Sequence, residues 1–270
     1  MSELWSDLLT CLKLEPVAPV ESSTAAAFEG RNQRLEYHRV FGGQILGQFV
    51  RAAELTRPGK AVKSLHALFP REGRAEESLR YDVTVHHEGR TFATLAVVAS
   101  QSSGVVATAS VSMHAPEDGP AHQWTGSVGA VPTDDHTVAV ELLPWEVRTR
   151  TDLNSTDTGS PEFEMWIRTP EVDPALAPAL AGYATDLTLI GTALRPMEGI
   201  SQVGNGTAFL SAVTCHNLWF HRPFRTDDWL LLRQHSPVLA HGRCFGRGDV
   251  FTADGTLVAS YAQEALARLP

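Results

Sequence analysis

A single carboxylate, that of Asp186, is the group in this sequence best suited to acid–base chemistry. It is the only acid between Gly182 and Leu194, where its polar neighbours are a tyrosine and three threonines. A carboxylate in such a setting can accept a proton from a water molecule and so turn the water into a nucleophile. The competing interpretation is electrostatic, because an acid in the first turn of a helix interacts favourably with the helix dipole.

Asp186 is predicted to stand at the start of a helix. Small or apolar side chains recur at positions i, i+3, i+4 and i+7, which gathers them on one helix face; these are Leu187, Ile190, Gly191 and Leu194. Pro196 marks the end of the helix, because proline cannot continue the hydrogen-bonding pattern. The first turn of this helix would therefore hold the carboxylate.

An earlier helix is predicted from four apolar residues with similar spacing, namely Ile45, Phe49, Ala52 and Ala53. Gly42 and Gly43 precede it, and paired glycines tolerate close approach of another backbone. Strands are predicted after this helix, at 81–86, 91–101 and 105–113. One helix followed by antiparallel strands indicates an α+β domain.

The same order of elements recurs in the second half of the chain. Strands are predicted after the Asp186 helix, at 209–221, 229–234, 242–251 and 257–263. Gln44 in the first helix corresponds in position to Asp186 in the second, and His66 corresponds to His216. This parallel indicates an internal duplication in which the polar residues of the two halves have diverged.

Composition limits the partners and the compartment. The chain has 270 residues and a formal net charge of −9, which argues against a nucleic-acid partner because phosphate binding needs a basic surface. No apolar run approaches the length of a membrane span, so no stable membrane association is expected. Three scattered cysteines and an acidic start to the N-terminus predict a cytoplasmic protein without a disulfide framework.

Prolines and small polar residues concentrate between Pro116 and Pro144, a composition typical of a connector. The length of the chain allows two domains of the common size. We therefore predict an N-terminal domain over residues 1–115, a connector over 116–143 and a C-terminal domain over 144–270.

Several motifs, taken in order, make the chain resemble the acyl-CoA thioesterase II (TesB-like) family. They are Val40–Gln44, Ser64–Phe69, Gly182–Leu187, His216–Phe224 and Leu257–Glu264. The resemblance covers nearly the whole chain apart from the connector. It implies a double hotdog fold of the α+β class, with two tandem hotdog domains, each a long central helix wrapped by a curved antiparallel sheet. It also implies hydrolysis of fatty acyl-CoA to fatty acid and CoA by a water molecule, without a metal, cofactor or covalent intermediate.

The resemblance further implies the residues that act. Asp186 matches the family's base and Gln263 matches a glutamine that helps to hold the water. The family's hydroxyl residue falls at Val213. Thr214 beside it is the catalytic candidate if a bulge shifts the strand, and Ser211 shares the face of Val213. The predicted substrate-binding residues are Gly43, Gln44, His66 and Ser211.

The resemblance implies a homo-oligomer, and Val213 leaves a catalytically weak or inactive acyl-CoA-binding protein as the alternative function. A hydratase of the same general fold would need a histidine five residues after Asp186, where Gly191 stands. A metal site at His216 and His221 is not expected, because residues five apart on a strand face opposite sides. The recurring histidines are predicted to pin strands through ring hydrogen bonds rather than to catalyse.

Overall fold

The computed structural model describes residues 2–35 and 39–269. Two compact units divide the chain. Unit 1 consists of Met1–His122, Ala175–Tyr183 and Asn217–Phe220, and unit 2 consists of Gln123–Pro174, Ala184–His216 and His221–Pro270. Among the helices of the described residues, none combines the length and apolarity that crossing a bilayer requires.

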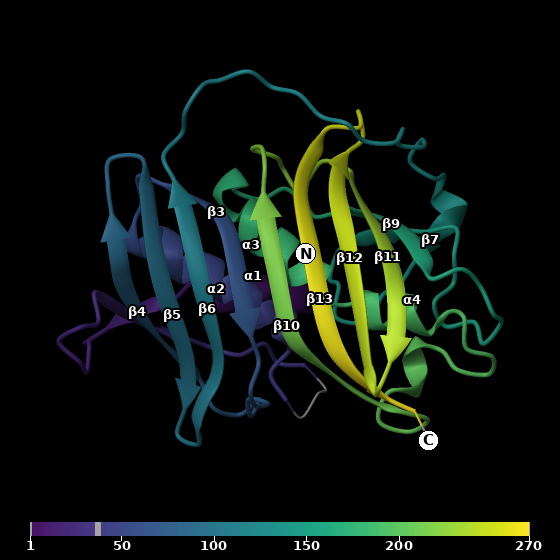
Figure 1. Ribbon diagram of the computed structural model, residues 1–270, viewed down its shortest axis with the longest axis horizontal. Helices are drawn as coiled ribbons and strands as arrows, with labels where there is room; N and C mark the ends of the chain where they lie inside the picture. Colours follow the sequence, from purple (N-terminus) through teal and green to yellow (C-terminus); the bar gives the residue numbers. More distant parts are fainter. Residues whose placement is uncertain (1, 36–38, 270) are drawn as a thin grey trace. The chain divides into compact units, whose positions relative to one another are not determined.

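Unit 1 contains an antiparallel sheet (Figure 1). Its strands follow one another in the order β1 (Glu15–Val17), β2 (Ala26–Gly30), β4 (Leu79–Glu88), β5 (Phe92–Gln101), β6 (Gly104–His114) and β3 (Ala61–Leu68). Burial alternates along most of these strands, so one face of the sheet lies on a core. The strands predicted at 81–86, 91–101 and 105–113 are confirmed, and β1 was not predicted.

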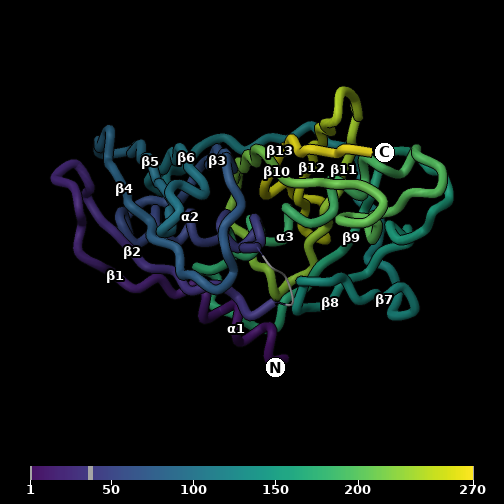
Figure 2. Tube along the Cα trace, turned by 90° about the horizontal axis from the view of Figure 1, so that it is seen from below, coloured from purple at the N-terminus to yellow at the C-terminus, as the bar shows by residue number. Residues whose placement is uncertain are grey.

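Two helices complete the core of unit 1. α1 (Glu3–Cys11) begins at Ser2, whose hydroxyl accepts a hydrogen bond from the Trp5 amide at 3.2 Å. α2 (Gly42–Thr56) lies against the strands (Figure 2). Most of its residues are buried. The helix predicted from the stripe of Ile45, Phe49, Ala52 and Ala53 is confirmed.

Two glycines on one face of α2 let a second helix of unit 1 approach closely. A Cβ atom on Gly43 would lie 2.5 Å from the carbonyl oxygen of Tyr183, and one on Gly47 would lie 3.0 Å from that of Ala179. Both carbonyls belong to α3 (Ala177–Thr185), one helical turn apart. The close backbone approach predicted for the pair Gly42 and Gly43 is thus found at Gly43, and Gly47 adds a second contact that was not predicted.

The strands of unit 2 also pair antiparallel (Figure 1). They follow the order β10 (Leu210–Phe220, of which the part up to His216 belongs to this unit), β13 (Leu257–Arg268), β12 (Arg243–Thr252), β11 (Leu230–Ala240), β9 (Glu162–Arg168), β8 (Glu146–Arg148) and β7 (Thr137–Val138). α4 (Leu189–Leu194) packs on β11 and β12. Short 3-10 helices lie at Asp134–His136, Pro174–Leu176 and Gln202–Gly204.

Pairing between strands extends two of them beyond their predicted ends. β13 continues past Gln263 to Arg268 because Leu266 pairs with Arg243 of β12. The sequence there is rich in good helix formers, so local propensity favoured the wrong boundary. β11 likewise continues through a bulge between His235 and Val238.

Part of the predicted connector packs on the sheet of unit 2. Val128 and Val131 contact a buried cluster of Trp166, Leu231 and Phe251. The Gln123 amide donates to the carbonyl oxygen of Gly255 at 2.8 Å and accepts from the amide of Leu257 at 3.1 Å. These contacts attach the segment to the β12–β13 hairpin.

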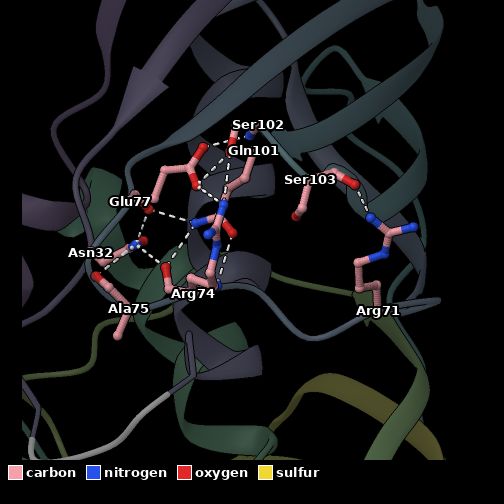
Figure 3. Close-up of polar contacts among 8 residues, drawn as sticks. All are labelled: Asn32, Arg71, Arg74, Ala75, Glu77, Gln101, Ser102 and Ser103. Carbon is pink, nitrogen blue, oxygen red and sulfur yellow. Dashed lines mark hydrogen bonds and ion pairs between the residues drawn. The ribbon is translucent and has the colours of Figure 1, made fainter.

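Two amide side chains secure the loop before β4 in unit 1 (Figure 3). Asn32 Nδ2 donates to the carbonyl oxygens of Arg74, Ala75 and Glu77 at 3.3, 3.2 and 2.5 Å. Gln101 Nε2 donates to the carbonyl oxygens of Arg74 and Glu77 at 2.8 and 2.5 Å. The loop's carbonyl groups thus find partners outside any sheet.

Replacing Asn32 by aspartate should lower the free energy of unfolding by about 1–2 kcal/mol. The change keeps the shape of the side chain but removes the donor atom and turns an acceptor toward three carbonyl oxygens. Urea unfolding measures the effect. Asn154→Asp, at an exposed position, adds the same charge as a control, and an equal loss in both variants would contradict the assigned role of the donor.

Candidate active site

Asp186 lies in a break between two helices, so the prediction of a single helix with Asp186 in its first turn was wrong. α3 ends at Thr185 and α4 begins at Leu189. The hydroxyl groups on either side of the break bond to other elements: Thr185 to His216, and Thr188 to the Gln234 amide. These hydrogen bonds tie the two sides of the break to His216 of β10 and Gln234 of β11.

The break changes the electrostatic setting of Asp186. The residue follows the C-terminal end of α3, which carries the negative end of the helix dipole. Asp186 also precedes α4, which begins three residues later at Leu189, so the ends of two helix dipoles act on it in opposite senses. The break thus replaces the expected setting of an acid in the first turn of one long helix.

Three buried polar side chains of unit 2 meet around the ring of His216. Its Nδ1 atom lies 3.0 Å from Gln263 Oε1 and 3.5 Å from Asp186 Oδ1. Its Nε2 atom lies 3.1 Å from Thr185 Oγ1. Exposed fractions are 0% for His216, 2% for Gln263 and 6% for Asp186, so the cluster is shielded from solvent.

Asp186 and Gln263 each keep one buried polar atom without a hydrogen-bond partner among the described residues. These atoms are Asp186 Oδ1, an acceptor, and Gln263 Nε2, a donor. Buried polar atoms are almost always satisfied in folded proteins, by protein groups or by water. A water molecule can accept a hydrogen bond from the amide and donate one to the carboxylate, which is the contact that water activation needs.

The hydroxyl candidates on β10 have other surroundings. Thr214 Oγ1 donates to the backbone carbonyl oxygen of Glu264 at 3.0 Å. The side chain of Glu264 is half-exposed. Ser211 is buried, and its backbone amide donates to Asn205 Oδ1 at 3.0 Å. Val213 is half-buried. A catalytic role for Thr214 and a substrate contact for Ser211 remain predictions.

Gln44, the counterpart of Asp186 in unit 1, is engaged by the protein itself. Its Oε1 accepts from the backbone N–H of Gln33 at 2.8 Å, and its Nε2 donates to Asn32 Oδ1 at 2.8 Å and to Gln48 Oε1 at 3.1 Å. Tyr81 adds a 2.6 Å hydrogen bond to Gln48 Oε1. These contacts give Gln44 a structural role, and its contact with substrate stays a prediction, as does that of Gly43.

The two corresponding histidines lie in different environments. His216 is buried, whereas His66 is exposed, with its Nδ1 3.1 Å from Asn217 Oδ1 and its ring edge-on to Trp219. β3 has a register shift between Val62 and Ser64, before His66, and a bulge of this kind exchanges the faces of the residues that follow. A substrate contact at His66 also stays a prediction.

Comparison with known proteins identifies the family. Residues 113–267 match the acyl-CoA thioesterase C-terminal domain family and residues 33–114 match the corresponding N-terminal domain family. The chain is 31% identical to acyl-CoA thioesterase 2 of Haemophilus influenzae, with 99% of each chain covered. The chain belongs to the acyl-CoA thioesterase II family.

Solved structures support the fold of this acyl-CoA thioesterase II family member. An acyl-CoA thioesterase II from Mycobacterium marinum is 31% identical, with 97% of this chain and 98% of that chain covered and a TM-score of 0.78. A hot dog fold protein from Alicyclobacillus acidocaldarius, 17% identical over 97% of this chain and 98% of its own, gives 0.76 and shares the fold. The predicted α+β double hotdog fold is confirmed.

The sequence did not identify the partners that His216 brings together in this acyl-CoA thioesterase II family member. The sequence did contain a signal, because His216 corresponds in position to His66 and both rings were expected to pin a strand through hydrogen bonds. Those bonds exist at His216, but they reach Thr185 and Gln263 beside Asp186. The position therefore belongs to the candidate active site.

Proposed function

We propose that this protein hydrolyses fatty acyl-CoA to free fatty acid and CoA, with Asp186 as the general base. The observation that carries the proposal is a pair of buried atoms, Asp186 Oδ1 and Gln263 Nε2, that have no hydrogen-bond partner among the described residues and belong to side chains that meet His216 Nδ1. Membership of the acyl-CoA thioesterase II family supports the substrate class.

In the proposed reaction Asp186 accepts a proton from a water molecule while the water oxygen attacks the thioester carbonyl carbon. The carbonyl oxygen becomes negative in the tetrahedral intermediate. The carbon–sulfur bond then breaks, and the CoA sulfur leaves as a thiolate that takes up a proton. Gln263 holds the water through its amide, which does not titrate. No step requires a metal or a cofactor.

The wider proposal includes a cytoplasmic location and a homo-oligomer. The location is supported by three cysteines that are all free thiols, two of them buried. Burial raises the pKa of the Cys11 thiol to about 12 and that of the Cys244 thiol to about 11, which keeps these thiols protonated and unreactive. The oligomer is supported by the family resemblance.

The test is release of free CoA from a panel of acyl-CoAs from acetyl to palmitoyl. CoA is best separated by chromatography, because the half-buried Cys215 can itself react with thiol reagents. Turnover of any member supports thioesterase activity, and the profile defines the acyl chain.

Binding of acyl-CoA without turnover would instead favour the inactive acyl-CoA-binding protein. Val213 is the specific reason to include this second candidate, since the resemblance implies a hydroxyl there. Val213→Thr then provides the matched variant: gain of turnover would identify the missing hydroxyl as the cause.

A further inference from the structure

We propose that His216 is a positioning residue that orients the Gln263 amide so that its N–H group, and not its carbonyl oxygen, faces the reacting water. The inference deepens the proposed function and rests on it. It assigns to His216 an effect on catalysis that acts through Gln263 and requires no contact with the substrate.

The protonation of the ring follows from its neighbours. His216 Nδ1 faces two oxygen atoms, Gln263 Oε1 at 3.0 Å and Asp186 Oδ1 at 3.5 Å. A carboxylate oxygen cannot donate, so the contact with Asp186 places the proton on Nδ1 whichever way the Gln263 amide is turned. Nε2 faces the hydroxyl of Thr185 at 3.1 Å, which can donate to an unprotonated ring nitrogen. A neutral ring with its proton on Nδ1 therefore suits both contacts.

This tautomer determines which end of Gln263 is available. Oε1 accepts from the His216 Nδ1–H group, so Nε2 is the end left for another molecule, and it is buried without a partner among the described residues. The reversed amide would direct N–H groups at the protonated Nδ1. It would also present a carbonyl oxygen that competes with Asp186 for the proton of the water.

Packing holds the ring in place as well. His216 is completely buried and stacks on Tyr261, with 6.0 Å between ring centroids and an interplanar angle of 5°. Tyr261 precedes Gln263 by two positions on β13, and both side chains are buried. The strand β13 thus provides both Tyr261, which holds the plane of the His216 ring, and Gln263, whose amide the ring orients. Residues that orient an active-site side chain in this way commonly change activity by roughly 10- to 100-fold when they are altered, as the partners of metal ligands do.

Two substitutions separate the roles of the two ring nitrogens. In the variant His216→Asn the side-chain amide nitrogen can occupy the place of Nδ1. In the variant His216→Gln the longer side chain brings its amide nitrogen to the place of Nε2. We expect His216→Asn to keep kcat within about tenfold of wild type and His216→Gln to lower kcat by about 100-fold, with KM little changed in both. Equal losses in both variants with intact circular dichroism would overturn the proposal.

A measurement on the wild-type protein remains decisive if the variants do not fold. Nitrogen-15 NMR of labelled histidine distinguishes a protonated from an unprotonated ring nitrogen, and we expect His216 to show a protonated Nδ1 and an unprotonated Nε2. The opposite tautomer, or a doubly protonated ring, would overturn the proposal. Absence of turnover in the wild type would defeat the proposed function instead, and the NMR result would still decide the orientation of Gln263.

Discussion

Asp186→Asn should reduce kcat for acyl-CoA hydrolysis by about 100- to 10,000-fold, the usual contribution of a general base. Asparagine has the size of aspartate but cannot accept a proton from water at neutral pH. The fold should persist, because asparagine keeps the shape of the side chain and its amide oxygen can keep the 3.5 Å contact that Asp186 Oδ1 makes with His216 Nδ1. Steady-state kinetics with the best substrate of the panel measures the effect, and thermal unfolding checks the fold.

Asp228→Asn is the matched control for the change in charge. It removes one negative charge from an exposed position of unit 2 and should leave kcat unchanged. Full activity of Asp186→Asn would rule out Asp186 as the base and direct attention to Gln44, its counterpart in unit 1. A rise in KM without a fall in kcat would point to substrate binding rather than to proton transfer.

Gly43→Ala should lower the free energy of unfolding by about 3 kcal/mol, the upper end of what overpacking usually costs. The added Cβ would lie 2.5 Å from the carbonyl oxygen of Tyr183 and would also meet the ring of Phe41. Phe41 cannot turn aside easily, because its ring packs edge-on against Tyr183 with centroids 4.9 Å apart. Relief therefore requires α2 and α3 to move apart within unit 1.

Gly59→Ala is the matched control in the same unit. A Cβ atom there meets nothing within 4 Å, so its effect should stay within about 0.5 kcal/mol. Urea unfolding of both variants gives the comparison. Similar stability of Gly43→Ala and wild type would mean that the close contact of the two helices is not required, and Gly43 would then be open to a role in substrate binding.

Much of the fold could be predicted from local pattern. The stripe of α2 and the alternation of β4 are properties of short segments, and each was found near its observed limits. Asp186 was singled out as the lone acid of its segment and Gln263 through the family resemblance, and the structure brings both side chains to His216.

Other features could not be predicted because their causes lie far away in the chain. The periodicity of Leu187, Ile190 and Leu194 indicated one helix, but hydrogen bonds from Thr185 and Thr188 to distant strands accompany a break there. The end of β13 depended on its pairing with β12. The direction of the Thr214 hydroxyl depended on the register of β10 beside Glu264.

By itself the sequence determined the class of the fold, the repeated order of elements and the polar residues worth testing, because these follow from periodicity and from motifs within short segments. Only the tertiary structure decided that Asp186 follows a helix end, that His216 joins Asp186 and Gln263, and that Gln44 is held by Gln33, Asn32 and Gln48. The physical reason is that buried polar groups must find partners, and those partners come from whichever segments the fold brings close.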